Sequence, residues 1–177
     1  MVEHLPKTSV ETMRKEELKV LDILEQHAKE NIDVLSKKCG FSRQKLSRII
    51  KHLEAKKIIW GYSAISGAEE NNLKEFFLLV KRNTIPFDDS FKKEVLFETL
   101  DRYSSNIKVE NISLTHGPYD GIVAFYAPDL IAAKTLLNQI GNNIGKYFTE
   151  MLLIENLIAI RKQGIKNPRL KELAKYL

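Results

Sequence analysis

Cysteine is nearly absent from this sequence: Cys39 is the only one in 177 residues. A single cysteine excludes a disulfide within the chain, and the scattered histidines form no HExxH motif or Cys/His cluster. No Ser/His/Asp order stands out either. We therefore expect no metal, no cofactor and no enzymatic activity, and we interpret Cys39 as a packing residue.

Long apolar runs are also missing. No stretch approaches the roughly 18 apolar residues that a membrane-spanning helix needs, and the N-terminal MVEHLPKTSVETMRKEE lacks the apolar core of a signal peptide. A composition of 44% hydrophobic and 29% charged residues is ordinary for a globular domain. The sequence predicts a cytoplasmic protein in a reducing compartment, with no membrane partner.

Positive charge is concentrated in one short window. Residues 36–57 hold one acid, Glu54, and eight basic side chains, which are Lys37, Lys38, Arg43, Lys45, Arg48, Lys51, Lys56 and Lys57. This window carries a net charge of +7, whereas the whole chain carries only +5, so the remaining residues sum to about −2. Charge confined to one element indicates a surface that binds a polyanion.

The basic window coincides with a helix-turn-helix pattern. Two short helical stretches flank the turn Cys39-Gly40-Phe41. Apolar residues at helical spacing predict a buried stripe of Val34, Leu35, Phe41, Leu46, Ile49, Ile50 and Leu53. Ser42 is placed as the N-cap of the second helix, because its hydroxyl can accept a hydrogen bond from the first turn.

The second helix carries residue types that suit the major groove of DNA. Arg and Gln can make bidentate contacts with base edges, whereas Lys mostly contacts phosphate. We expect Arg43, Gln44, Lys45, Ser47, Arg48 and Lys51 on its exposed side. Ser42, His52 and Lys56 complete the predicted DNA-binding set, with His52 beside phosphates. The alternative is an ordinary amphipathic helical hairpin with a solvated basic face.

A change of pattern after residue 66 separates a second domain. Residues 58–65 (IIWGYSAI) are β-branched and aromatic and predict a linker strand, and polar SGAEENN follows. Beyond it the expected elements are strand 75–83, helix 86–103, strand 107–115, strand 122–127, helix 129–146 and strand 148–160. The second of these helices should bury Leu130, Ala133, Leu137, Ile140 and Ile144. The order βαββαβ predicts a ferredoxin-like unit.

The predicted fold class is therefore α+β. A winged-helix-like helix-turn-helix domain over residues 1–66 precedes a ferredoxin-like effector and oligomerisation domain over residues 67–164. Residues 165–177 form a C-terminal helical extension with Asn167 as its cap, and a frayed tail is the alternative for this segment.

Three strands carry nearly continuous apolar runs, at residues 76–80, 122–126 and 151–154. A sheet covered on one face only should alternate apolar with polar residues, so both faces of this sheet are expected to be buried. The two helices can cover one face, and we expect a second copy of the chain to cover the other. Such a homodimer also supplies two helix-turn-helix units for a two-fold site on double-stranded DNA.

These features resemble the Lrp/AsnC (feast/famine) transcriptional regulators over roughly residues 16–160. The most specific pieces are the strand motif Ile59-x-Gly61-Tyr62 and the turn Gly117-Pro118-Tyr119-Asp120 before an apolar strand. Members usually have a glycine where this chain has Lys57. The resemblance implies a sequence-specific regulator that binds promoter or operator DNA as a dimer and assembles into tetramers or octamers. It also implies a small-molecule effector, often an amino acid.

The turn HGPYDG is the predicted effector site. Its glycines allow close backbone approach, and a carboxylate there can accept a hydrogen bond from a ligand ammonium. The predicted set is His116, Gly117, Tyr119, Asp120 and Gly121. The alternative is a plain hairpin turn.

Two other classes of function stay open at this stage. Some proteins that resemble this family decarboxylate tetrapyrrole haem precursors and keep a vestigial helix-turn-helix, and His116 would then serve the tetrapyrrole. A vestigial motif has no reason to hold a net charge of +7 in 22 residues, so a regulator is the better interpretation. An architectural chromatin protein with weak sequence preference is the third candidate.

Overall fold

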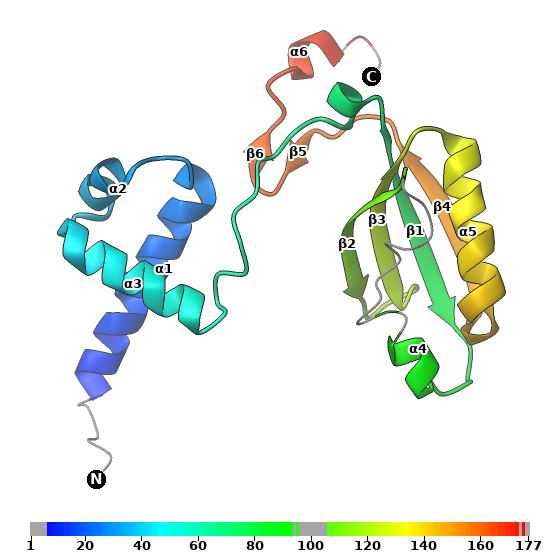
Figure 1. Ribbon diagram of the computed structural model, residues 1–177, viewed down its shortest axis with the longest axis horizontal. Helices are drawn as coiled ribbons and strands as arrows, with labels where there is room; N and C mark the ends of the chain where they lie inside the picture. Colours follow the sequence, from blue (N-terminus) through cyan, green and yellow to red (C-terminus); the bar gives the residue numbers. More distant parts are fainter. Residues whose placement is uncertain (1–6, 94, 96–105, 174, 176–177) are drawn as a thin grey trace. The chain divides into compact units, whose positions relative to one another are not determined.

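The computed structural model describes residues 7–93, 95, 106–173 and 175. The chain divides into two compact units (Figure 1), one formed by Met1–Ile65 with Arg161–Lys166 and the other by Ser66–Ile160 with Asn167–Leu177. Within the described ranges, no helix is both long enough and apolar enough to cross a membrane.

The first unit is built from three helices, α1 (Lys7–His27), α2 (Ile32–Cys39) and α3 (Arg43–Ala55). Its core joins Val20 and Leu24 of α1 to Leu35 and Cys39 of α2 and to Leu46, Ile49 and Leu53 of α3. Phe41 and Ile50 of the expected stripe are half-buried and pack against this core, and Val34 is half-buried. The predicted helix-turn-helix and its buried stripe are confirmed.

The turn between α2 and α3 is specified locally. Gly40 ends α2 in the left-handed region, at φ 67°, where a side chain would be strained. The amide of Phe41 then donates to the Ser36 carbonyl at 3.0 Å. Ser42 caps α3, because its Oγ accepts from the Lys45 amide at 3.2 Å. The predicted N-cap is confirmed, and it determines where α3 begins.

The end of α3 follows from an unusual backbone at Lys57. This residue is left-handed, at φ 55°, although it is not a glycine. Its amide donates to the Glu54 carbonyl at 2.9 Å, and the next amide, of Ile58, donates to Leu53 at 2.9 Å. The helix stop that glycine usually provides is thus retained by a lysine, which costs about 1–2 kcal/mol in conformational energy.

Residues 58–65 do not form the predicted linker strand. Residues 58 and 59 form a bend, residues 60–65 have no regular secondary structure, and the segment pairs with no strand of the described chain. Trp60 is 96% exposed and Tyr62 is 54% exposed. A strand requires a neighbour that satisfies its N–H and C=O groups. The apolar composition of this segment therefore lacks a partner within one chain, although Tyr62 Oη donates to Glu54 at 3.0 Å.

The second unit contains a four-stranded antiparallel sheet. After the short helix η1 (Ala68–Asn71) come β1 (Lys74–Arg82), α4 (Asp89–Lys93), β2 (Lys108–Leu114), β3 (Gly121–Ala127), α5 (Leu130–Ile144), η3 (Gly145–Tyr147) and β4 (Phe148–Asn156). The strand order is β2-β3-β1-β4. The predicted α+β class and ferredoxin-like order are confirmed. Of the helix predicted over 86–103, residues 94 and 96–103 lie outside the described residues.

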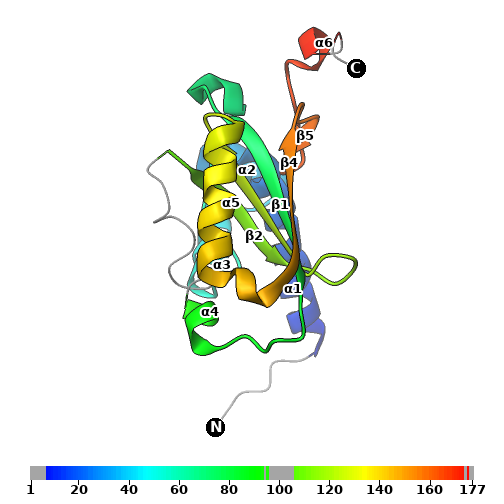
Figure 2. The same ribbon diagram turned by 90° about the vertical axis from the view of Figure 1, so that its right-hand side faces the viewer.

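Helix α5 lies along one face of the sheet (Figure 2). Ala133, Leu136, Ile140 and Ile144 pack against strand residues that include Phe76 and Phe125. The predicted stripe needs one correction, since Leu136 is 1% exposed whereas Leu130 is 41% exposed. Leu136 lies three residues after Ala133 and so on the same side of the helix, while Leu130 lies in the first turn.

The other face of the sheet holds an apolar patch separate from the core. In the register of the strands, Phe77 lies beside Ala124 and Ile154, and Leu79 lies beside Ile122 and Leu152. None of these six side chains belongs to the core cluster under α5. Leu152 and Ile154 are 39% and 41% exposed. We call these six residues the open-face patch.

The chain after β4 differs from the prediction. Strand β4 ends at Asn156, and a hairpin of β5 (Arg161–Lys162) and β6 (Ile165–Lys166) follows, with α6 confined to Leu170–Leu173. Both turn residues, Gln163 and Gly164, have positive φ, 43° and 81°, as the primed turns of two-residue hairpins require. Residues 174, 176 and 177 of the predicted extension lie outside the described part of the chain.

Candidate nucleic-acid interface

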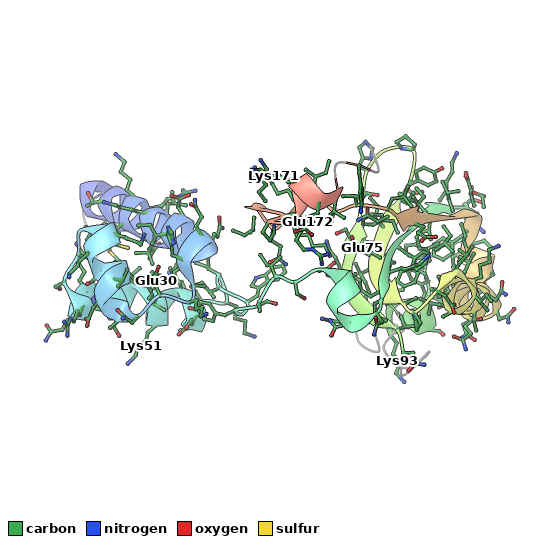
Figure 3. All side chains as sticks on the ribbon, turned by 90° about the horizontal axis from the view of Figure 1, so that it is seen from above. Glu30, Lys51, Glu75, Lys93, Lys171 and Glu172 are labelled. Carbon is green, nitrogen blue, oxygen red and sulfur yellow. The ribbon has the colours of Figure 1, made fainter. Side chains whose placement is uncertain are left out.

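The outer side of α3 forms a shallow, open hollow. Its lining residues are Ile32, Arg43, Gln44, Ser47, Arg48 and Lys51. Positions 43, 44, 47, 48 and 51 recur at helical spacing, so they share one face of α3. Figure 3 shows Lys51 projecting away from the three helices. Five of the nine residues predicted to bind DNA therefore lie together on one exposed surface.

Arg43 begins this surface and is held by α2. Its guanidinium pairs with the Asp33 carboxylate, although the Arg43 side chain remains 69% exposed. Asp33 lies in the first turn of α2, where a carboxylate is also favoured by the helix dipole. This pair links the starts of the two helices and leaves most of the guanidinium open to solvent.

Lys45 does not lie on the exposed side, where it was expected. Its Nζ is 2.5 Å from Glu16 Oε1 of α1 and 4.6 Å from the centroid of the Phe41 ring. Lys45 lies four residues before buried Ile49 and so borders the buried stripe. Its charge is neutralised within the unit, and its ammonium helps to hold α3 against α1.

His52 also faces α1. Its Nε2 is 3.3 Å from Glu17 Oε1, and the side chain is half-buried. Because His52 follows Lys45 by seven residues, or two turns, both side chains lie along the same edge of α3. Among the remaining predicted residues, Ser42 is the helix cap and Lys56 is exposed at the C-terminal end of α3.

One residue of the hollow was not predicted. Ile32, the first residue of α2, is 37% exposed and contributes an apolar contact surface beside Arg43 and Gln44. The capping pattern at Asn31 was the available signal, because Asn31 Oδ1 accepts from Asp33 and Val34 at 3.1 and 3.0 Å. That cap fixes Ile32 as the first residue of α2.

Cys39 takes no part in this surface. It is 1% exposed within the core of the first unit, and burial raises the pKa of its thiol, with Lys19 acting in the opposite direction. A buried thiol with a raised pKa is a poor nucleophile. The interpretation of Cys39 as a packing residue is confirmed.

The predicted effector residues lie together in the β2–β3 turn, and Asp120 stabilises this turn through hydrogen bonds. Its Oδ2 accepts from the Arg82 amide at 2.8 Å, and its own amide donates to the Val80 carbonyl at 2.9 Å. The Thr115 amide donates to the Asp120 carbonyl at 2.9 Å. Asp120 therefore fastens the β2–β3 hairpin to the end of β1.

Other residues of the turn are also engaged. Tyr119 Oη donates to Glu150 Oε1 at 3.2 Å, and desolvation together with this carboxylate raises the pKa of Tyr119. A Cβ at Gly121 would lie 2.9 Å from Val80 Cγ2, so the packing requires a glycine there. His116 and Gly117 are exposed. Among the described residues, no group of three or more His, Cys, Asp or Glu could hold a metal.

Several solved protein structures are similar to this chain. No family model and no curated protein matches the sequence. An AsnC family transcriptional regulator from Agrobacterium tumefaciens is 18% identical, with a TM-score of 0.64 over 88% of this chain and 97% of that chain. A transcriptional regulator from Neisseria meningitidis, solved in complex with L-Met, is 19% identical, with a TM-score of 0.64 over 96% and 99%.

A feast or famine regulatory protein from M. tuberculosis, complexed with L-methionine, is 15% identical, with a TM-score of 0.67 over 84% of this chain and 94% of that chain. Each of these similarities spans both units and nearly the whole length of the other protein. The chain therefore has the fold of the Lrp/AsnC (feast/famine) transcriptional regulators.

Proposed function

We propose that this protein is a sequence-specific DNA-binding transcriptional regulator that acts as a homodimer or a larger oligomer. The observation that carries the proposal is the hollow on α3, where Arg43, Gln44, Ser47, Arg48 and Lys51 share one exposed face. These side chains combine bidentate donors with cations, on a helix whose first turn is capped by Ser42. The fold shared with transcriptional regulators supports this proposal.

In this mechanism the N-terminal half of α3 enters the major groove. Gln44, Ser47 and Arg48 contact base edges, and Arg43 joins them from its place beside Asp33. Lys51 and Lys56 lie further along α3 and contact phosphates. Lys45 and His52 are positioning residues, because their pairs with Glu16 and Glu17 help to hold α3 against α1.

The first prediction separates base recognition from phosphate binding. Arg48→Ala or Gln44→Ala should each weaken binding to the preferred site by about 1–3 kcal/mol and relax the preference at one base position. Lys56→Gln should weaken binding to all duplexes alike, because phosphates carry no sequence information. The measurement is the affinity of each variant for duplexes that differ from the preferred site at single base pairs.

Lys45→Gln is the matched control on the same helix. It removes one charge that faces α1, so it should lower the melting temperature of the first unit without changing the preference at any base. If Arg48→Ala and Lys56→Gln gave the same profile across the duplexes, the assignment of α3 to the groove would be wrong.

The proposed dimer forms through the open-face patch. Six apolar side chains in two adjacent rows lie on the sheet face opposite α5, and the flanking rows are polar, with Tyr126, Glu75 and Asn156 on one side and Lys81 and Glu150 on the other. An apolar centre with a polar border is typical of protein interfaces. A second copy presents the same patch, so a two-fold contact buries both.

The second prediction tests this interface. Leu152→Glu combined with Ile154→Glu should convert the dimer to monomers, because two charges would be buried in each copy of the patch. Ile131→Glu is the control, since Ile131 is 76% exposed on α5, on the covered side of the sheet. Sedimentation equilibrium reports the masses, including any tetramer or octamer. A double variant that sediments like the wild type would contradict the proposed interface.

We also propose that a small molecule, an amino acid in the first instance, binds at the β2–β3 turn and biases assembly. Two proteins of this fold were solved with L-methionine, which supports an amino acid as the ligand class. Oδ2 of Asp120 accepts from Arg82, and the carboxylate still supplies a negative charge toward a ligand ammonium. His116, Gly117, Tyr119 and Gly121 complete the proposed site.

The third prediction concerns Asp120→Asn. The amide oxygen can still accept from the Arg82 amide, so the fold and basal DNA affinity should be unchanged, whereas the change in DNA affinity caused by the amino acid should be lost. The measurement is operator affinity of both proteins with each of the twenty amino acids. Equal responses in the two proteins would show that the turn only closes a hairpin, and no response in either would exclude an amino-acid effector.

A further inference from the structure

A second concentration of positive charge lies in the C-terminal segment 161–175. It contains one acid, Glu172, and six basic residues, which are Arg161, Lys162, Lys166, Arg169, Lys171 and Lys175. The segment carries a net charge of +5, beside the +7 of residues 36–57, so all other residues together carry −7. These two stretches therefore carry a net positive charge, whereas the rest of the chain is net negative.

The C-terminal segment has a defined backbone. The primed turn at Gln163-Gly164 closes the β5–β6 hairpin. Asn167 then fixes the base of the hairpin, since its amide donates to Ile160 at 3.0 Å and its Nδ2 donates to Ala159 at 2.9 Å. Asn167 Oδ1 also accepts from the Arg169 amide at 2.8 Å and so positions the start of α6.

Two cations of the hairpin, Arg161 and Lys166, are exposed and repel one another, and the Arg161 guanidinium also donates to the Gly164 carbonyl. Arg161 lies directly opposite Lys166 in the hairpin register, and like charges at such positions are destabilising. Both side chains are exposed, as is Lys171 on α6 (Figure 3). The single acid, Glu172, pairs with Arg169 at 3.1 Å. An anion bound between Arg161 and Lys166 would relieve their repulsion.

We propose that the β5–β6 hairpin forms a second DNA contact, which binds the phosphate backbone of the duplex without reading its sequence. The inference rests on the proposed function. One observation favours DNA over another polyanion: the hairpin Arg161–Lys166 belongs to the same compact unit as α3. Each phosphate contact adds to affinity through the release of counterions.

The test is the salt dependence of DNA binding by the full-length chain. The variant K166Q removes one exposed cation of the hairpin, and K134Q removes one exposed cation from α5 as the matched control. For a duplex containing the preferred site, the slope of log K against log salt should become less steep by about 0.9 for each contacting lysine removed. The control should keep the wild-type slope, and the ratio of specific to non-specific affinity should be unchanged in both variants.

Three further results separate DNA binding by the hairpin from unfolding and from membrane binding. The melting temperature of K166Q should not fall, because the substitution removes the repulsion with Arg161, so weaker binding cannot be ascribed to unfolding. A K166Q slope equal to that of the control overturns the inference while Arg48→Ala still tests α3 independently. Loss of binding to phosphatidylserine vesicles, with the DNA slope unchanged, would assign the segment to membranes and overturn it as well.

Discussion

The burial of one stripe of α3, formed by Leu46, Ile49 and Leu53, is the constraint on which the candidate interface depends. Packing of these side chains on Val20 and Leu24 of α1 sets the rotation of α3 about its axis. That rotation directs Lys45 and His52 to the carboxylates of α1 and turns the opposite face outward. Apolar packing thus decides which cations of a basic helix remain available to a ligand.

Features that depend on neighbouring residues could be predicted from the sequence. The Ser42 cap, the turn at Gly40 and the order of strands and helices in the second unit each follow from spacing over a few residues. The partners of Lys45 and His52 could not be predicted, because Glu16 precedes Lys45 by 29 residues, Glu17 precedes His52 by 35, and nothing local marks the pairing. The β5–β6 hairpin was missed because two-residue strands show no periodicity.

The prediction of a linker strand at residues 58–65 is wrong for a different reason. Its composition favours a strand, but a single described chain offers no strand beside it, and Trp60 is left 96% exposed. The open-face patch of the sheet likewise leaves apolar side chains exposed, including Leu152 and Ile154. Both segments carry more apolar surface than the described residues of one copy cover, which agrees with a protein that completes its fold on association. The proposed dimer also provides the two α3 helices that a two-fold DNA site requires.

The central claim is that two α3 helices, related by a two-fold axis, bind one DNA site. The most direct measurement is selection of bound fragments from a pool of random duplexes by the full-length protein. The account predicts a pseudo-palindromic site whose half-sites are separated by about 34–36 Å, one turn of DNA, or by a multiple of that distance. Enriched fragments without two-fold character, or no enrichment over the starting pool, would contradict it.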